Sequence, residues 1–255
     1  MNMDRNEAAP SSGAEERSPI AAHGLTHTGK RPRNEDSHLI REDLGLVVVA
    51  DGFGGSAGGD IAARHAVDEI ADCFGAQEEH TIPTFEPHEL TDGLSVATTR
   101  FAIEHAHKRI RYESQRTGPP GMATAVAVLV AAGPRVVVGN AGGVRVYRLR
   151  GDALEELTRD APGAVAGGMG ACPVGGAIGR VQPTVRAVSW KPGDRFLVCT
   201  AGLYRVLSDE AIRCTLAVRG TPAEGAAALV GRALHSGATD NLTAVVAIPG
   251  RAAGG

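Results

Sequence analysis

Two aspartates stand where metal chemistry is possible. Asp51 follows the apolar run at residues 44–50 and begins the segment Asp-Gly-Phe-Gly-Gly, and Asp240 comes just before the apolar run at residues 242–248. A carboxylate at the end of a strand projects into a cleft, and a neighbouring glycine lets the backbone approach an ion. Mg²⁺ and Mn²⁺ prefer carboxylate, carbonyl and water oxygens, so these positions could hold ions that also bind a phosphate.

Each of these aspartates also has an ordinary structural interpretation. Asp-Gly and Asp-Asn pairs are common in turns, because Asp and Asn side chains bond to the nearby backbone and Gly accepts left-handed conformations. Asp51 or Asp240 alone is therefore compatible with a turn, and the choice depends on the rest of the chain.

Short β-branched runs predict the strands that position these residues. The expected strands are residues 44–50, 123–131, 135–139, 144–149, 195–200 and 242–248. Short glycine and proline links join the strands between residues 123 and 149, which favours antiparallel hairpins over crossover connections.

Apolar residues at steps of three and four predict helices between these strands. The first two would run through Ala63, Val67, Ile70 and Phe74, and through Leu90, Leu94, Ala97 and Phe101. A third begins at the capping box Thr221-Pro222-Ala223-Glu224 and ends near Gly237. The sequence thus predicts an α+β fold with helices packed outside antiparallel sheets.

Length and composition favour one domain. The 255 residues are 43% hydrophobic, enough for one sizeable core. Residues 1–20 are rich in Ser, Pro, Glu and Ala, so we expect a disordered tail followed by a single domain at residues 21–250. A net charge of -3 argues against a nucleic-acid or membrane partner. Without a secretory signal, a long apolar run or Cys-x-x-Cys spacing, we expect a cytoplasmic protein.

Other residues with reactive side chains give weaker signals. His105 and His107 are two positions apart on a predicted helix, so they point in different directions, and we expect both to be solvated. Cys199 lies in a predicted core strand without a phosphate-binding loop after it, and we interpret it as a packing residue.

Six segments, in chain order, resemble the PPM (PP2C-like) family of metal-dependent serine/threonine protein phosphatases. They are residues 31–36 (RPRNED, like R-x-x-N-E-D), 51–62 (DGFGG followed by GDIA), 122–124 (MAT, like G-T-T), 140–147 (NAGGVRVY, like N-V-G-D-S-R-x-Y), 199–203 (CTAGL, like C-S-D-G-L) and 240–243 (DNLT, like D-N-I-T). The resemblance covers nearly all of residues 23–249 and implies a β-sandwich of two antiparallel sheets flanked by helices.

The same resemblance implies a mechanism and its residues. Two Mn²⁺ or Mg²⁺ ions would activate a water that attacks phosphoserine or phosphothreonine in a protein. Arg31 would bind the substrate phosphate, and Glu35 and Asp36 would hold metal-bound waters. The metal ligands would be the Asp51 carboxylate, the Gly52 carbonyl and Asp240, with Asp160 as a candidate for an optional third ion.

The sequence departs from the family pattern at the metal site. Ala201 stands where C-S-D-G-L has a metal-binding aspartate, and a methyl group binds no ion. Gly143-Val144 replaces the Asp-Ser of G-D-S-R, and residues 161–179 look like a shortened flap. Losing a ligand-supporting partner typically lowers metal affinity or activity by roughly 10- to 100-fold, so losing a ligand predicts a weak second ion.

Two functions follow from this pattern. The first is a phosphatase with activity weakened by Ala201. The second is a catalytically inactive pseudophosphatase that binds a regulatory partner or a phosphoprotein without hydrolysis. Manganese-dependent turnover separates the two.

Overall fold

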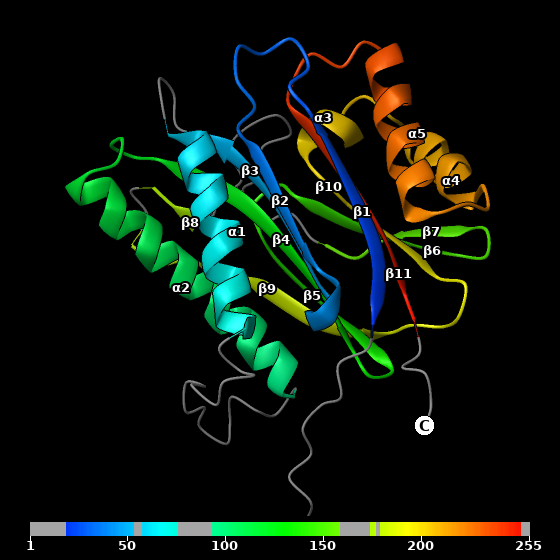
Figure 1. Cartoon of the computed structure of the whole chain (residues 1–255), viewed down its shortest axis with the longest axis horizontal. Helices are drawn as coiled ribbons and strands as arrows, with labels where there is room; N and C mark the ends of the chain where they lie inside the picture. The colour runs from blue at the N-terminus through cyan, green and yellow to red at the C-terminus, as the bar shows by residue number, and fades with distance from the viewer. Residues whose placement is uncertain (1–18, 54–57, 76–92, 159–173, 177–178, 251–255) are drawn as a thin grey trace, which may run out of the picture.

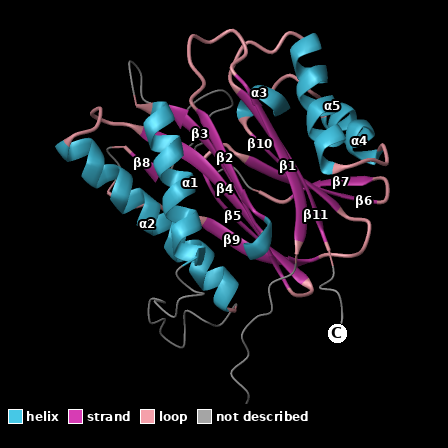
Figure 2. Ribbon diagram, viewed as in Figure 1, coloured by secondary structure: helices cyan, strands magenta, loops and turns pink. Residues whose placement is uncertain are grey.

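A computed structural model of the chain describes residues 19–53, 58–75, 93–158, 174–176 and 179–250. Two antiparallel sheets stack on each other, and helices cover the outer face of each (Figure 1). Figure 2 shows the strands gathered between the two groups of helices. The α+β sandwich expected from the sequence is confirmed.

The first sheet has the strand order β2-β3-β4-β5-β9, with β8 paired to one end of β4. A short 3-10 turn, η1, connects β2 to β3, and helices α1 and α2 pack on the outer face. The bounds are β2 Asp36–Arg41, η1 Glu42–Leu44, β3 Leu46–Phe53, α1 Gly59–Gly75, α2 Leu94–Arg116, β4 Ala123–Ala132, β5 Arg135–Ala141, β8 Val174–Gly175 and β9 Thr184–Ser189.

The second sheet has the strand order β1-β11-β10-β6-β7 and carries three helices on its outer face. Its elements are β1 Ile20–His27, β6 Arg145–Arg150, β7 Ala153–Glu156, β10 Arg195–Cys199, α3 Ala201–Tyr204, α4 Asp209–Ala217, α5 Pro222–His235 and β11 Leu242–Pro249. The end of β10 lies beside the start of β11, and the Thr200 N–H extends this pairing by donating to the Thr243 carbonyl at 3.1 Å.

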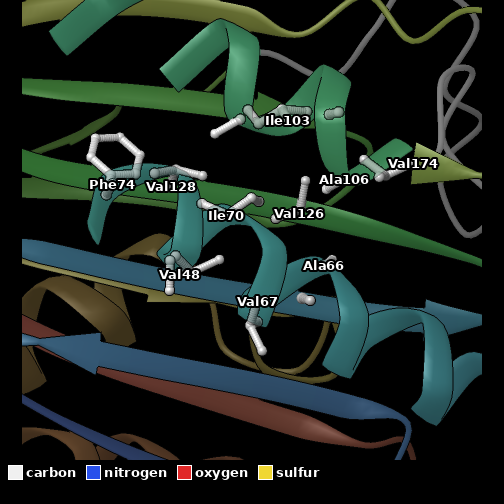
Figure 3. Packing of buried hydrophobic residues seen from close by; sticks show 14 of the residues in the cluster. Val48, Ala66, Val67, Ile70, Phe74, Ile103, Ala106, Val126, Val128 and Val174 are labelled. Carbon is white, nitrogen blue, oxygen red and sulfur yellow. The ribbon is translucent and has the colours of Figure 1, made fainter. Parts of the chain in front are cut away.

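Three apolar clusters hold the four layers together. Val48 on β3 faces α1 and α2 in the first cluster, whereas its neighbours Val47 and Val49 face the second sheet in another. Figure 3 shows Val48 beside Ile70 of α1 and the strand residues of β4. A strand turns alternate side chains to opposite faces, so residues 46–50 of this central strand are apolar on both faces.

The six strands expected from the sequence are present, but β1, β2, β7, β8, β9 and the helices α3 and α4 were not predicted. β1 and β9 lie at sheet edges; exposed and partly buried residues alternate along β1, and β9 has partly buried residues between two exposed ends. Such mixed polar strands lack the continuous apolar run that reveals a central strand.

One local prediction was wrong. The second predicted helix is present as α2, which starts at Leu94, and its buried positions include Ala97, Ile103 and Ile110; Leu90 lies outside the described residues. His107, expected in solvent, is 3% exposed, and its Nδ1 accepts the Gly175 N–H at 3.0 Å. The inward face of α2 is wider than the apolar spacing indicated, because it also covers β8.

The beginning of the chain adds one strand to the sandwich. Ile20, assigned to the tail by composition, is the first residue of β1 and is 2% exposed. The other residues of the predicted tail, up to position 18, lie outside the described residues. Across the described part of the chain, no helix has the length and apolar character needed to span a bilayer.

The capping box predicted at the start of α5 is confirmed. The Thr221 hydroxyl accepts the Glu224 N–H at 3.2 Å, and the Thr221 N–H donates to the Glu224 carboxylate at 2.8 Å. These bonds satisfy two backbone N–H groups, those of Thr221 and Glu224, that would otherwise bond to water.

We expect Thr221→Ala to lower the free energy of unfolding by about 1 kcal/mol, because it removes the N-cap acceptor. Thr221→Ser keeps that acceptor and should stay close to wild type. Urea denaturation followed by circular dichroism measures both. Equal losses in the Ala and Ser variants would show that the cap does not stabilise α5.

Candidate functional site

Two aspartates lie directly opposite each other on neighbouring strands of the first sheet. Asp36 is the first residue of β2, and the antiparallel register sets it directly opposite Asp51 near the end of β3. Opposed residues of such a pair have Cβ atoms roughly 4.5–5.5 Å apart. The register therefore brings two negative charges together at one end of the sandwich.

Asp36 is held by two threonines from the second sheet. Its Oδ2 accepts hydrogen bonds from the Thr200 hydroxyl at 2.8 Å and the Thr243 hydroxyl at 2.7 Å. Its Oδ1 is buried and has no hydrogen-bond partner among the described residues. Burial and the charge of Asp51 raise the pKa of Asp36 well above its ordinary value.

Asp51 has a similar environment. Burial raises its pKa to about 6, whereas a hydrogen bond from the Ala201 N–H acts in the opposite direction. The negative charges of Asp240 and Glu35 raise it further, and the positive charge of Arg205 lowers it. Asp51 thus lies among several carboxylates at the start of α3.

Asp240 and Arg31 form the solvent-exposed side of the site. Arg31 Nε lies 2.9 Å from Asp240 Oδ1, and Arg31 Nη2 donates to Asp240 Oδ2 at 3.1 Å. The side chains are 60% and 39% exposed, so a ligand can reach both. This two-point geometry is also the one in which a guanidinium binds phosphate.

Asn241 fixes the loop that carries Arg31 and Glu35. Its Nδ2 donates to the Thr28 and Arg33 carbonyls, both at 2.8 Å, and its Oδ1 accepts the Glu35 N–H at 2.9 Å. The sequence motif Asp-Asn-Leu-Thr contained this residue, but we assigned it no role. Its partners lie more than 200 positions away, and no local pattern reveals them.

Two glycines allow the backbone to pack closely here. A Cβ on Gly52 would lie 2.0 Å from the Gly59 carbonyl oxygen, and one on Gly202 would lie 2.0 Å from the Asn241 carbonyl oxygen. The Gly52 N–H also donates to the Glu35 carbonyl at 3.0 Å. Any larger residue would push β3 or α3 away from the carboxylates.

Glu35 brings another negative charge into this group. Burial raises its pKa, and the charge of Asp60 at the start of α1 raises it further. Hydrogen bonds at 2.9 and 3.0 Å hold the Glu35 backbone between Asn241 and Gly52. Four acidic residues named from the sequence, Glu35, Asp36, Asp51 and Asp240, therefore influence one another electrostatically.

These residues fit a divalent cation that also keeps several waters. Within the described ranges, no group of three or more His, Cys, Asp or Glu side chains is placed to coordinate one ion. Mg²⁺ is usually bound by one or two carboxylates plus water. Asp36 Oδ1 has no hydrogen-bond partner in the described part of the chain, and the pKa of Asp51 is raised. Both observations indicate carboxylates whose negative charge is not fully balanced by nearby cations.

The positions that depart from the family pattern lie beside this group. Ala201 is the first residue of α3 and is 7% exposed. The Tyr204 hydroxyl donates to the Gly143 carbonyl at 2.7 Å, and the Tyr204 ring lies 4.1 Å from the Arg145 guanidinium carbon. Asp160, the candidate for a third ion, lies outside the described residues.

The sequence profile of the family described as Protein phosphatase 2C matches residues 23–231. The chain belongs to the protein phosphatase 2C family. The matched range includes Arg31, Asp51 and Ala201, and the two-sheet fold agrees with solved structures of the family. The resemblance stated from the sequence motifs is confirmed at the level of the family.

Individual proteins and solved structures are also similar to the chain. The serine/threonine phosphatase stp of Listeria monocytogenes is 25% identical over 236 residues, which covers 85% of this chain and 90% of that protein. The structure of PppA, a key regulatory component of T6SS in Pseudomonas aeruginosa, has a TM-score of 0.75 and 30% identity and covers 92% of this chain and 99% of that chain. The catalytic domain of PstP, solved with 2 manganese ions, has a TM-score of 0.72 and 26% identity and covers 91% of this chain and 98% of that chain.

The raised carboxyl pKa values predict how pH affects the metal-free protein. A carboxyl whose folded pKa exceeds its unfolded value stabilises the fold at low pH, and this stabilisation is lost as pH rises through the folded pKa. In a chelating buffer, we expect the free energy of unfolding to fall by on the order of 2 kcal/mol as pH rises from about 4 to about 7.

Asp51→Asn removes one of the two facing charges and should flatten this pH dependence and stabilise the metal-free protein at neutral pH. Asp68→Asn, at an exposed position of α1, serves as the matched control. Urea titrations across the pH range give the comparison. An unchanged slope in the Asp51 variant would mean that repulsion at this site does not affect stability.

Proposed function

We propose that this protein is a metal-dependent phosphatase that hydrolyses phosphoserine and phosphothreonine in proteins, with activity weakened by Ala201. The observation that carries the proposal is the facing pair Asp36 and Asp51, in which one buried carboxylate oxygen of Asp36 accepts no hydrogen bond from the described residues. Unpaired acidic oxygens in a buried site are expected where cations bind. The family membership supports the reaction class.

The proposed metal ligands are the Asp51 carboxylate, the Gly52 carbonyl and Asp240, with Glu35 and Asp36 holding waters around the ions. When bound, Mn²⁺ or Mg²⁺ lowers the pKa of water and neutralises charge on the phosphoryl oxygens. The family relative PstP binds two manganese ions, and this chain would hold the second one weakly.

The remaining steps depend on the chain's own side chains. Arg31 would bind the phosphoryl oxygens with its two-pronged guanidinium, replacing its present contact with Asp240. Thr200 and Thr243 fix one oxygen of Asp36, so the other points in a constant direction. This positioning reduces the reorganisation that a reaction at the phosphorus would otherwise need.

Ala201 is the reason for expecting weakened activity. Its backbone N–H neutralises part of the Asp51 charge, but its methyl group gives no ligand. Two divalent ions would then share fewer carboxylates, and their mutual repulsion would be less compensated. The ion nearer α3 should therefore be the weaker one.

The second candidate function is a binding protein without hydrolysis. Two observations favour it, namely Ala201 and the ion pair in which Arg31 occupies both oxygens of Asp240. The same surface would then bind a phosphoprotein or a regulatory partner in the cytoplasm. PppA, described as a regulatory component, offers a precedent for regulation within the same fold.

Turnover of p-nitrophenyl phosphate and of a phosphothreonine peptide, measured against Mn²⁺ concentration, tests the proposal. We expect manganese-dependent turnover that Asp51→Asn abolishes. Ala201→Asp should lower the Mn²⁺ concentration for half-maximal rate by roughly 10-fold or more, since it restores a carboxylate ligand.

Wild-type protein without any rate above background at millimolar Mn²⁺, together with an active Ala201→Asp variant, would favour the binding protein. Circular dichroism and unfolding curves of each variant check that the fold is intact. Asp68→Asn again serves as a control, because this exposed residue of α1 should leave the rate unchanged.

A further inference from the structure

Arg205 is a cation beside the carboxylates that the family motifs do not account for. It is exposed, and it follows α3 in the helical conformation, with its N–H donating to the Ala201 carbonyl at 3.1 Å. Among the described residues it makes no hydrogen bond or ion pair through its side chain. Its guanidinium is therefore available for a ligand.

The backbone places Arg205 on the same side of α3 as Ala201. Residues four apart on a helix are neighbours on its surface, and helical side chains lean toward the N-terminal end. A long side chain at position 205 thus extends toward the turn where the Ala201 N–H bonds to Asp51. The positive charge of Arg205 acts on Asp51 accordingly.

Neighbouring contacts hold this turn in place. Tyr204 bonds to the Gly143 carbonyl at 2.7 Å and stacks on Arg145, and Gly202 packs against the Asn241 carbonyl. The backbone that carries Arg205 is therefore anchored to the turn before β6 and to the residue before β11. Only the arginine side chain itself needs to move to meet a ligand.

Ala201 makes Arg205 more available. A carboxylate at position 201 would form an ion pair with an arginine four residues later on the helix. The alanine leaves the guanidinium without that partner and removes one negative charge. The α3 side of the site therefore favours an anion more than a second cation.

We propose that Arg205 is a second phosphate-binding residue of this site, contacting the phosphoryl oxygens from the α3 side while Arg31 contacts them from the Asp240 side. The ligand is the dianionic phosphoryl group of a phosphate monoester. This inference deepens the proposed function and rests on it, since both concern the same site and the same class of ligand.

The test measures binding of inorganic phosphate by isothermal titration calorimetry in a chelating, metal-free buffer. We expect Arg205→Ala to weaken the affinity by about 10-fold, the usual effect of losing a charge-assisted hydrogen bond. Arg205→Lys should retain part of the affinity as a point charge. The losses should shrink as salt concentration rises.

Arg219→Ala is the matched control. Arg219 is also exposed, but it lies between α4 and α5, next to Gly220, which contacts the start of β10 at the far end from the site. Its phosphate affinity should equal that of wild type. Unfolding curves of the Arg205 and Arg219 variants should also match wild type.

A second measurement ties Arg205 to Ala201. In the Ala201→Asp background, the added carboxylate pairs with Arg205, so Arg205→Ala should have a smaller effect on phosphate affinity than in wild type. Equal effects in the two backgrounds would contradict the placement of Arg205 beside position 201.

The outcomes separate this inference from hydrolysis. If Arg205→Ala leaves both the phosphate affinity and the KM for phosphopeptide unchanged while Mn²⁺-dependent turnover persists, the inference is wrong and the proposed function stands. If Arg205 controls phosphate affinity in a protein that never turns over, the second phosphate contact is correct and hydrolysis is not. In an active enzyme, Arg205→Ala should raise KM more than it lowers kcat.

Discussion

The repulsion between Asp36 and Asp51 is the constraint on which the site depends. Their separation is fixed by the pairing of β2 with β3, and that register is fixed by apolar packing on both faces of β3. A slip by one residue would turn Val48 toward the wrong layer. The core therefore forces two carboxylates together, and protonation or bound cations must relieve the repulsion.

Hydrogen bonds from the surrounding polar residues keep the two carboxylates from moving apart. Thr200 and Thr243 bond one oxygen of Asp36, and Asn241 ties the loop before β2 to the start of β11. These residues come from the second sheet, whereas Asp36 and Asp51 belong to the first. The site thus exists only where the ends of the two sheets meet, and sandwich stability and site geometry are coupled.

Charge is distributed unevenly across the site. The side near Glu35 and Asp60 is strongly acidic, whereas the α3 side has alanine at position 201 and an exposed arginine at position 205. An ion should bind best beside the acidic residues, and the phosphate beside the basic ones. One polarised site of this kind is compatible with slow hydrolysis as well as with retention of a phosphoprotein.

The sequence alone determined the family, the central strands, the capping box of α5 and the acidic residues at strand ends, because these are local patterns of apolar period, turn chemistry and motif spacing. Tertiary structure decided the rest. The edge strands β1 and β9, the buried His107 and the roles of Asn241, Thr200 and Thr243 depend on partners distant in the chain. The availability of Arg205 likewise depends on how α3 packs on the outer face of the second sheet, and long-range packing of this kind leaves no periodic signal in the sequence.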